Sequence, residues 1–148
     1  FINQIFTIIL MAFKINVSHN GKTFKVETED EKLVGLSIGE KVDGAEVSED
    51  LQGYELEIRG TSDKSGFTGL EEIDGPNMKR ALLGYGKAMK RKPKGEKKKS
   101  TRPKGLRLRK TVRGKEISLD TVQINTKVTK EGAKKFADLF APAEEKSE

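Results

Sequence analysis

The sequence FKINVSHNGKTFKVE, residues 13–27, contains the strongest local structural signal in the N-terminal half of the chain. Apolar and polar residues alternate from Phe13 to Val17, which is the period of a half-buried strand. Asn20-Gly21 then supplies the left-handed pair that favours a two-residue hairpin turn, and the alternation resumes after it. The stretch therefore predicts two antiparallel strands joined by a tight turn.

Two later stretches, residues 54–59 and 122–128, alternate in the same way and predict further strands. Turn signals such as Asp43-Gly44 are frequent, and strands do not alternate with helices. This pattern predicts a mainly β fold, specifically a small antiparallel β-barrel. Apolar residues at helical spacing between Ala133 and Phe140 predict a short C-terminal helix.

The segment 78–116 is strongly basic. It contains 17 basic and 2 acidic residues, a net charge of +15, while the rest of the chain contains 12 basic and 21 acidic residues, a net charge of −9. A block of like charge repels itself, so we expect it to fold tightly only when a polyanion neutralises it. Nucleic acid is the leading polyanion in a cell, which makes it the expected partner.

Composition divides the chain into five parts, which are a start region 1–11, a barrel body 12–77, an extended basic segment 78–116, a closing strand with a short helix 117–141 and an acidic polar tail 142–148. The apolar start region is too short to span a bilayer. We interpret Met11 as the true start and residues 1–10 as an upstream extension, with a hydrophobic anchor as the alternative.

Glycine and proline residues interrupt the basic segment, which argues against a regular helix there. Arg107 and Arg109 flank Leu108, and this alternation suits an extended strand on a phosphate backbone. Arginine binds phosphate in a forked geometry and stacks on bases. Such a segment suits folded RNA better than DNA, because DNA-reading modules usually present a helix to the major groove.

Three alternatives to this interpretation stay open. The basic segment could be a disordered, solubilising tail, or part of an adaptor that docks on an acidic protein or an anionic membrane. A nucleic-acid enzyme would instead need clustered metal-binding carboxylates or a nucleophile with its base, and the acidic residues here are dispersed.

Residue types that build catalytic and metal sites are scarce. The chain has no cysteine, which excludes disulfides and cysteine-based zinc sites and is consistent with the cytoplasm. His19, the only histidine, is predicted to be a solvated turn residue, and a metal site needs several converging ligands. Gly21-Lys22-Thr23 lacks the earlier glycine of a phosphate-binding loop. We therefore predict no catalytic residue, metal or cofactor, and a protein that is not an enzyme.

Residues 58–67, Ile-Arg-Gly-Thr-Ser-Asp-Lys-Ser-Gly-Phe, resemble the loop of the archaeal and eukaryotic small-subunit ribosomal protein six family. Further stretches follow in the order that this family shows, namely Gly75-Pro76, Lys79–Leu83, Gly95–Lys99, Arg109–Gly114 and Val122–Asn125. The resemblance runs from about Ala12 to Gly132. It is carried by the stretches together, because no single one is specific.

The sequence departs from the family pattern at three places. Thr61 stands where the family usually has glycine, Thr68-Gly69 stands where it has Pro-Met, and residues 100–106 look like extra material. The long C-terminal helix of eukaryotic members, with its phosphorylation sites, is missing. The resemblance therefore implies an archaeal member without phosphorylation control.

The resemblance implies a β-barrel protein of the small ribosomal subunit, located in the cytoplasm. Its implied partners are ribosomal RNA and neighbouring ribosomal proteins, with no membrane and no small-molecule substrate. The matching positions implied to contact RNA are Lys79, Arg80, Lys97, Lys98, Arg109, Lys110 and Arg113. Charge alone adds Arg91, Lys92 and Arg107.

Overall fold

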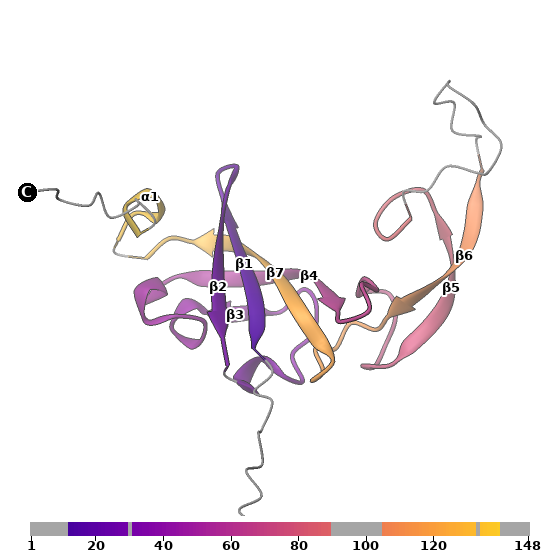
Figure 1. Ribbon diagram of the computed structural model, residues 1–148. Helices are drawn as coiled ribbons and strands as arrows, with labels where there is room; N and C mark the ends of the chain where they lie inside the picture. Colours follow the sequence, from indigo (N-terminus) through magenta and orange to yellow (C-terminus); the bar gives the residue numbers. More distant parts are fainter. Residues whose placement is uncertain (1–11, 30, 90–104, 133, 140–148) are drawn as a thin grey trace, which may run out of the picture.

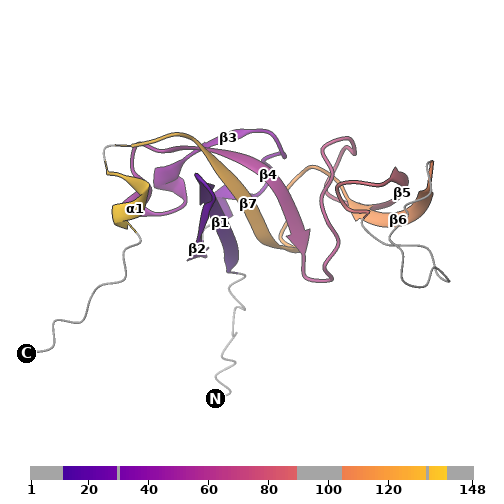
Figure 2. The same ribbon diagram turned by 90° about the horizontal axis from the view of Figure 1, so that it is seen from above.

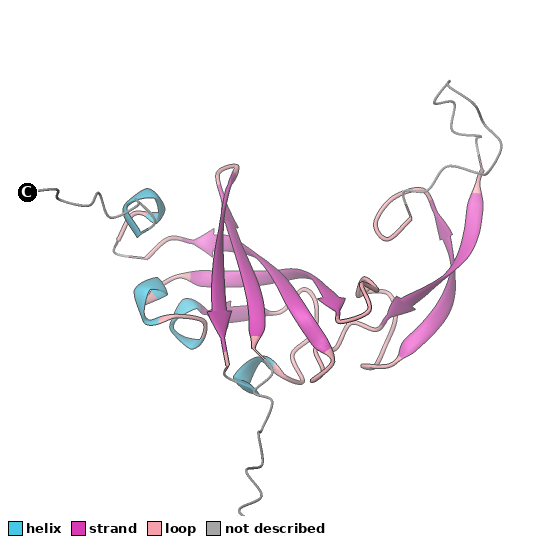
Figure 3. Cartoon of the chain, in the orientation of Figure 1, coloured by secondary structure: helices cyan, strands magenta, loops and turns pink. Residues whose placement is uncertain are grey.

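The computed structural model describes residues 12–29, 31–89, 105–132 and 134–139 (Figure 1). Its strands are β1 (Phe13–His19), β2 (Lys22–Thr28), β3 (Lys41–Asp43), β4 (Glu55–Asp63), β5 (Met78–Gly84), β6 (Arg107–Arg113) and β7 (Thr121–Lys130). The helical turns are the 3-10 segments η1 (Glu31–Leu33), η2 (Gly44–Glu46) and η3 (Glu49–Leu51) and the α-helix α1 (Phe136–Leu139). Strands predominate among the described residues (Figure 3), so the prediction of a mainly β fold is confirmed.

The β1–β2 hairpin has the predicted turn. Phe13 pairs with Thr28 and His19 with Lys22, which leaves Asn20 and Gly21 as the two turn residues. Both have positive φ angles, 45° and 79°, as a left-handed two-residue turn requires.

Five strands form one sheet in the order β2-β1-β7-β4-β3. The predicted closed antiparallel barrel is wrong for this sheet, since β2 and β3 lie at its two open edges and β1 runs parallel to β7. Closure would require the edge strands to pair, and β3 offers only three residues for pairing. On the side away from β2, strand β1 pairs with β7 and not with β3 or β4, which are nearer in sequence. Alternation alone does not determine this choice.

The hydrophobic core lies against one face of this sheet. The inward residues of β1 are fully buried, and residues of β4 and β7 such as Leu56, Ile58 and Ile124 join them. Tyr54 is 1% exposed, and its hydroxyl donates a hydrogen bond to the carbonyl of Lys134. Along β1 from Phe13 to Ser18, buried residues alternate with exposed or half-buried ones, because successive side chains of a strand point to opposite faces of the sheet.

Helix α1 consists of four residues, so the predicted C-terminal helix is a single turn in the described part of the chain. Phe136 is 5% exposed, and its ring centroid lies 5.4 Å from that of His19. His19 Nε2 also lies 2.5 Å from Glu131 Oε1, and only 18% of the His19 side chain is exposed. The prediction that His19 is a solvated turn residue is therefore wrong, because the segment after β7 folds back over the hairpin.

Strands β5 and β6 form a separate two-stranded antiparallel sheet, here called the ribbon. It extends from the end of the sheet where β4 and β7 meet, well away from the β1–β2 hairpin (Figures 1 and 2). The ribbon forms the two ends of the predicted basic segment, and residues 90–104 between them lie outside the described residues. As expected, the described parts of this segment contain no helix.

Strand β4 extends further than the sequence predicts. The sequence predicts a strand over residues 54–59, but Gly60 and Thr61 are also buried and pair with β7, and the strand ends only at Asp63. Register shifts near Gly60 and Asp63 bend the strand. The end of β4 lies at the base of the ribbon, where Asp63 contacts Arg113 of β6.

Candidate nucleic-acid interface

The two faces of the ribbon differ in chemistry. Residues opposite each other in an antiparallel pair share a face, and successive residues of a strand alternate between faces. One face, here called the arginine face, carries the pairs Arg80–Thr111, Leu82–Arg109 and Gly84–Arg107. The other, here called the covered face, carries the pairs Lys79–Val112, Ala81–Lys110 and Leu83–Leu108.

The arginine face is open to solvent. Arg80, Arg107 and Arg109 are exposed, and Leu82 between them is 50% exposed. Among the described residues, no acidic side chain forms an ion pair with these three arginines. The ribbon and its adjoining turns, residues 78–89 and 105–115, contain eight basic and no acidic residues. The face therefore presents a concentrated positive field to a polyanion.

The covered face uses its lysines within the protein. The Nζ atom of Lys110 donates to the carbonyl of Ala88 at 3.1 Å, and Met89 beside it is 0% exposed. Lys87 in the same turn donates to the carbonyl of Arg59 in β4 at 2.8 Å. Lys79 is exposed and donates to the carbonyl of Asp74 at 3.1 Å. The bond from Lys87 ties the ribbon to the large sheet, whereas those from Lys110 and Lys79 hold the turns next to the ribbon.

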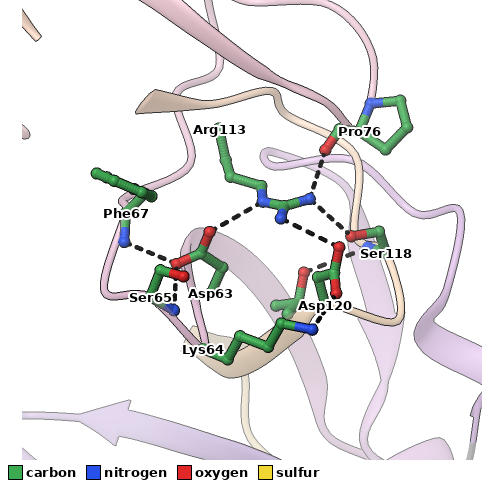
Figure 4. Close-up of polar contacts among 9 residues, drawn as sticks. Asp63, Lys64, Ser65, Phe67, Pro76, Arg113, Ser118 and Asp120 are labelled. Carbon is green, nitrogen blue, oxygen red and sulfur yellow. Dashed lines mark hydrogen bonds and ion pairs between the residues drawn. The ribbon is translucent and has the colours of Figure 1, made fainter. Parts of the chain in front are cut away.

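Arg113 lies at the base of the ribbon, and its guanidinium group joins four chain segments (Figure 4). Its Nε atom donates to Asp63 Oδ2 at 3.1 Å, and Nη2 donates to Asp120 Oδ2 at 3.2 Å. Its Nη1 atom donates to the carbonyl of Pro76 at 3.0 Å and to Ser118 Oγ at 3.4 Å. Only 11% of the Arg113 side chain is exposed. This arginine is committed to internal contacts.

Asp63 organises the loop that follows β4. Its Oδ1 atom accepts hydrogen bonds from the backbone amides of Ser65 at 2.9 Å and Phe67 at 2.8 Å. The Asp63 amide donates to the carbonyl of Phe67 at 3.1 Å, which closes the loop from the other side. Because Asp63 Oδ2 accepts from Arg113, one carboxylate sets both the loop and the ribbon base (Figure 4).

Two more ion pairs surround this centre. Lys64 Nζ lies 2.8 Å from Asp120 Oδ1. This hydrogen bond lowers the pKa of Asp120, and the hydrogen bond from Arg113 lowers it by a smaller amount. Lys115 Nζ lies 2.7 Å from Asp74 Oδ1, which lowers the pKa of Asp74 and raises that of Lys115. Both carboxylates are therefore favoured in the ionised form that binds their basic partners.

A groove of about 500 Å³ lies between the Asp63 loop and the ribbon. The loop contributes Ser65, Phe67 and Thr68, and the ribbon contributes Arg80 and Arg109 among its lining residues. Phe67 is half-buried, while both arginines are exposed. The groove thus combines an aromatic ring, hydroxyl groups and two exposed arginines at the edge of the arginine face, with Lys110 as a third basic residue of its lining.

The structure separates the ten sequence-predicted residues into three groups. Those on the exposed or partly exposed surface of the ribbon are Lys79, Arg80, Arg107, Arg109 and Lys110. Arg113 lies apart from them, buried at the ribbon base. Those outside the described residues are Arg91, Lys92, Lys97 and Lys98.

Sequence reasoning missed the acidic and aromatic partners of the site. Asp63 and Asp120 looked like two of many dispersed carboxylates, and Phe67 was noted only as the end of a resembling loop. An Asp followed by Ser and Gly is a signal for a side chain that binds the backbone of its own turn. The contact with Arg113, 50 residues away, has no local signal.

In the part of the chain that the structure describes, no three His, Asp or Glu side chains come together as a metal site would need. No helix among the described residues has the length and apolar character needed to cross a membrane.

Comparison with known proteins matches most of the chain to one family. The model of the family described as ribosomal protein S6e matches residues 11–141. The small ribosomal subunit protein eS6 of Methanosphaera stadtmanae is 40% identical over 141 residues, which cover 93% of this chain and 99% of that protein. The eS6 protein of Methanobrevibacter smithii is 40% identical over 139 residues, which cover 93% of this chain and 99% of that protein. The eS6 protein of Methanocaldococcus jannaschii is 41% identical over 120 residues, which cover 81% of this chain and 82% of that protein.

Proposed function

Because this chain belongs to the ribosomal protein S6e family, we propose that its ribbon binds ribosomal RNA within the small ribosomal subunit. The chain is an archaeal-type member of the family. It is a structural constituent of the small ribosomal subunit and not an enzyme, and its place is in the cytoplasm with the ribosome. The proposal concerns the surface that binds the RNA.

The observation that carries the proposal is the arginine face. Arg80, Arg107 and Arg109 are exposed on one side of a two-stranded ribbon, and no described acidic residue pairs with them. Guanidinium groups bind phosphate oxygens in a forked geometry that lysine does not reproduce. An extended ribbon also brings several such groups along a polynucleotide backbone at once.

The remaining predicted residues take different roles in this proposal. Lys79 and Lys110 add charge beside the arginine face while they hold the turns next to the ribbon through the carbonyls of Asp74 and Ala88. Arg113 supports the ribbon from inside, since its donors are used by the protein. The basic residues of 90–104 extend the contact in this proposal, Lys97 and Lys98 through the family resemblance and Arg91 and Lys92 on charge alone.

The polarity of the chain supports one orientation on the RNA. Outside segment 78–116 the net charge is −9, so a phosphate backbone repels the body as it attracts the ribbon. We therefore place the body away from the RNA surface, where neighbouring basic ribosomal proteins are its partners.

Salt-dependent binding to small-subunit ribosomal RNA tests the proposal. Each phosphate contact steepens the plot of log affinity against log salt by roughly 0.7 to 0.9. The variant Arg80→Gln/Arg107→Gln/Arg109→Gln should flatten the slope by about 2 to 3, because three contacts are lost. Filter binding over a range of salt concentrations measures this slope.

A control variant removes the same charge from the body. Lys22, Lys25 and Lys127 are all exposed on the large sheet, and Lys22→Gln/Lys25→Gln/Lys127→Gln should leave the slope close to that of the wild type. Equal flattening in both variants would show that only net charge matters. A salt slope that the arginine substitutions leave unchanged would show that the arginine face does not contact the RNA.

A further inference from the structure

The groove between the Asp63 loop and the ribbon has features that the arginine face alone does not explain. Its volume of about 500 Å³ falls within the range of sites that enclose a small ligand, about 300 to 1,000 Å³. A groove of this size accommodates one nucleotide and excludes a duplex. It opens beside Arg80 and Arg109, which belong to the surface proposed to bind RNA.

Resting on that proposed function, we propose that the groove takes one unpaired nucleotide of the RNA. Its base stacks against Phe67, and its phosphate lies between Arg80 and Arg109. Single-stranded loops and bulges are the parts of RNA whose bases are free to leave the helix and stack on aromatic side chains. The ligand is therefore a bulged or looped-out nucleotide.

The loop wall of the groove is formed in advance of binding. Asp63 Oδ1 binds the amides of Ser65 and Phe67, and Gly66 between them adopts a φ of +81°, which glycine tolerates without strain. Arg113 holds the other oxygen of the same carboxylate at 3.1 Å. The position of Phe67 is thus set by backbone bonds, and a ligand does not need to order the loop.

The ribbon wall supplies two cations at a suitable spacing. Arg80 pairs with Thr111, and Arg109 precedes Thr111 by two residues, so the two arginines are diagonal neighbours on one face. Such neighbours lie about 7 to 8 Å apart at the backbone, within reach of long side chains that converge on one group. A phosphate between them receives hydrogen bonds from both guanidinium groups.

The arrangement favours a nucleotide over an acidic peptide. A peptide carboxylate uses the two arginines but leaves the ring of Phe67 without a flat partner. A nucleotide matches an aromatic ring, hydroxyl groups and two cations together, because it carries a base, a ribose and a phosphate. Stacking tolerates any base, since every base has a π face.

Two synthetic RNA hairpins that differ only by one bulged 2-aminopurine nucleotide provide the test. We expect the wild-type protein to bind the bulged hairpin more tightly, and the fluorescence of the bulged base to change on binding. Phe67→Leu should reduce the affinity for the bulged hairpin by roughly 5- to 100-fold and leave the fluorescence unchanged, because the stacking surface is lost. Phe67→Tyr should retain both effects.

The two proposals fail in different ways. Phe67→Leu keeps the backbone bonds of the loop and removes no charge, so the salt slope should match that of the wild type. Equal binding of the two hairpins by the wild type, or a bulge preference that survives in Phe67→Leu, would overturn the nucleotide groove alone. A salt slope unchanged by the arginine substitutions would overturn the proposed function itself. Thermal unfolding of each Phe67 variant confirms that the protein tested is folded.

Discussion

Arg113 and Asp63 form a buried ion pair that joins the ribbon to the large sheet, with 3.1 Å between Nε and Oδ2. Their side chains are 11% and 1% exposed. The second oxygen of Asp63 binds the loop that forms one wall of the groove. A single contact between β6 and the end of β4 therefore sets both surfaces proposed to bind RNA.

Asp63→Ala should lower the free energy of unfolding by about 3 to 5 kcal/mol, because it leaves the buried Arg113 charge without its main partner. It also removes the acceptor of two loop amides. Urea unfolding monitored by circular dichroism measures the loss. Asp120→Ala serves as the control and should cost less, because the Asp120 side chain is 45% exposed and water replaces part of the contact. Equal costs for the two variants would contradict the central position of Asp63.

The acid sensitivity of folding should include a contribution from Asp120. Hydrogen bonds from Lys64 and then Arg113 lower its pKa from the usual 3.8 in the folded protein. A carboxyl with a lowered folded-state pKa stabilises the protein above 3.8, and this contribution is lost as the pH falls through the folded-state pKa. The free energy of unfolding should therefore fall more steeply below about pH 4 in the wild type than in Asp120→Asn.

Urea titrations over the acidic range at low salt measure this difference. About 1 M salt should narrow it, because the Debye length falls to about 3 Å and the exposed Lys64–Asp120 pair is screened. Parallel curves for the wild type and Asp120→Asn below about pH 4 would show that the pair does not contribute to stability.

Thr61 and Gly69 are in direct contact, and both are departures from the family pattern noted in the sequence. The Gly69 amide donates to the Thr61 carbonyl at 3.0 Å, and a Cβ atom at position 69 would lie 2.1 Å from Thr61 Oγ1. Gly69→Ala should therefore cost about 1 to 3 kcal/mol of folding free energy through overpacking. Thr61→Ala/Gly69→Ala should recover part of this cost, because the nearest clashing atom is gone while Ile38 Cδ1 at 3.0 Å still crowds the new Cβ atom. Urea unfolding of the four proteins in the mutant cycle measures the coupling.

Gly84→Ala is the matched control for that cycle. A Cβ atom at Gly84 meets nothing within 4 Å, and the residue lies in a strand with no positive φ. Its substitution should change stability little or raise it by up to about 1 kcal/mol through lost unfolded-state freedom. If Gly69→Ala behaves like Gly84→Ala, the contact with Thr61 is not a packing constraint.

Arg109 and Arg113 should respond oppositely to substitution although both were predicted to contact RNA. Arg109→Gln should flatten the salt slope of RNA binding by about 0.7 to 0.9 with little change in stability. Arg113→Gln should lower the free energy of unfolding, since it leaves Asp63 buried without its basic partner, and keep the salt slope of the folded fraction. Filter binding and urea unfolding of both variants separate the roles, and a flattened slope in folded Arg113→Gln would assign it to the RNA contacts.

Local signals predicted the parts of the fold that depend on neighbours in sequence. The hairpin followed from Asn20-Gly21 between two alternating runs, and its turn has the expected positive φ angles. The same alternation predicted strand β4 but not where the strand ends. Gly60 and Thr61 have a composition typical of loops, yet their pairing with β7 extends the strand. Propensity is a weak guide where distant pairing decides.

The candidate site was predictable in kind and not in detail. Charge counting located the cationic segment and predicted a polyanionic partner for it, because net charge does not depend on how the chain folds. It treated all cations of the segment alike. Arg107, Arg109 and Arg113 alternate onto the same face of β6, so the burial of Arg113 depends on the carboxylates that the fold brings to the ribbon base.

By itself, the sequence determined the strand periods, the β1–β2 turn, the charge polarity and the absence of cysteine and clustered-histidine chemistry. The tertiary structure alone decided the open sheet with its parallel β1–β7 pair, the burial of Arg113 and the groove beside Phe67. The physical reason is the distance along the sequence between the residues that interact. Backbone period and charge are properties of neighbouring residues, whereas strand partners, burial and cavities arise only when distant segments compete for the same core.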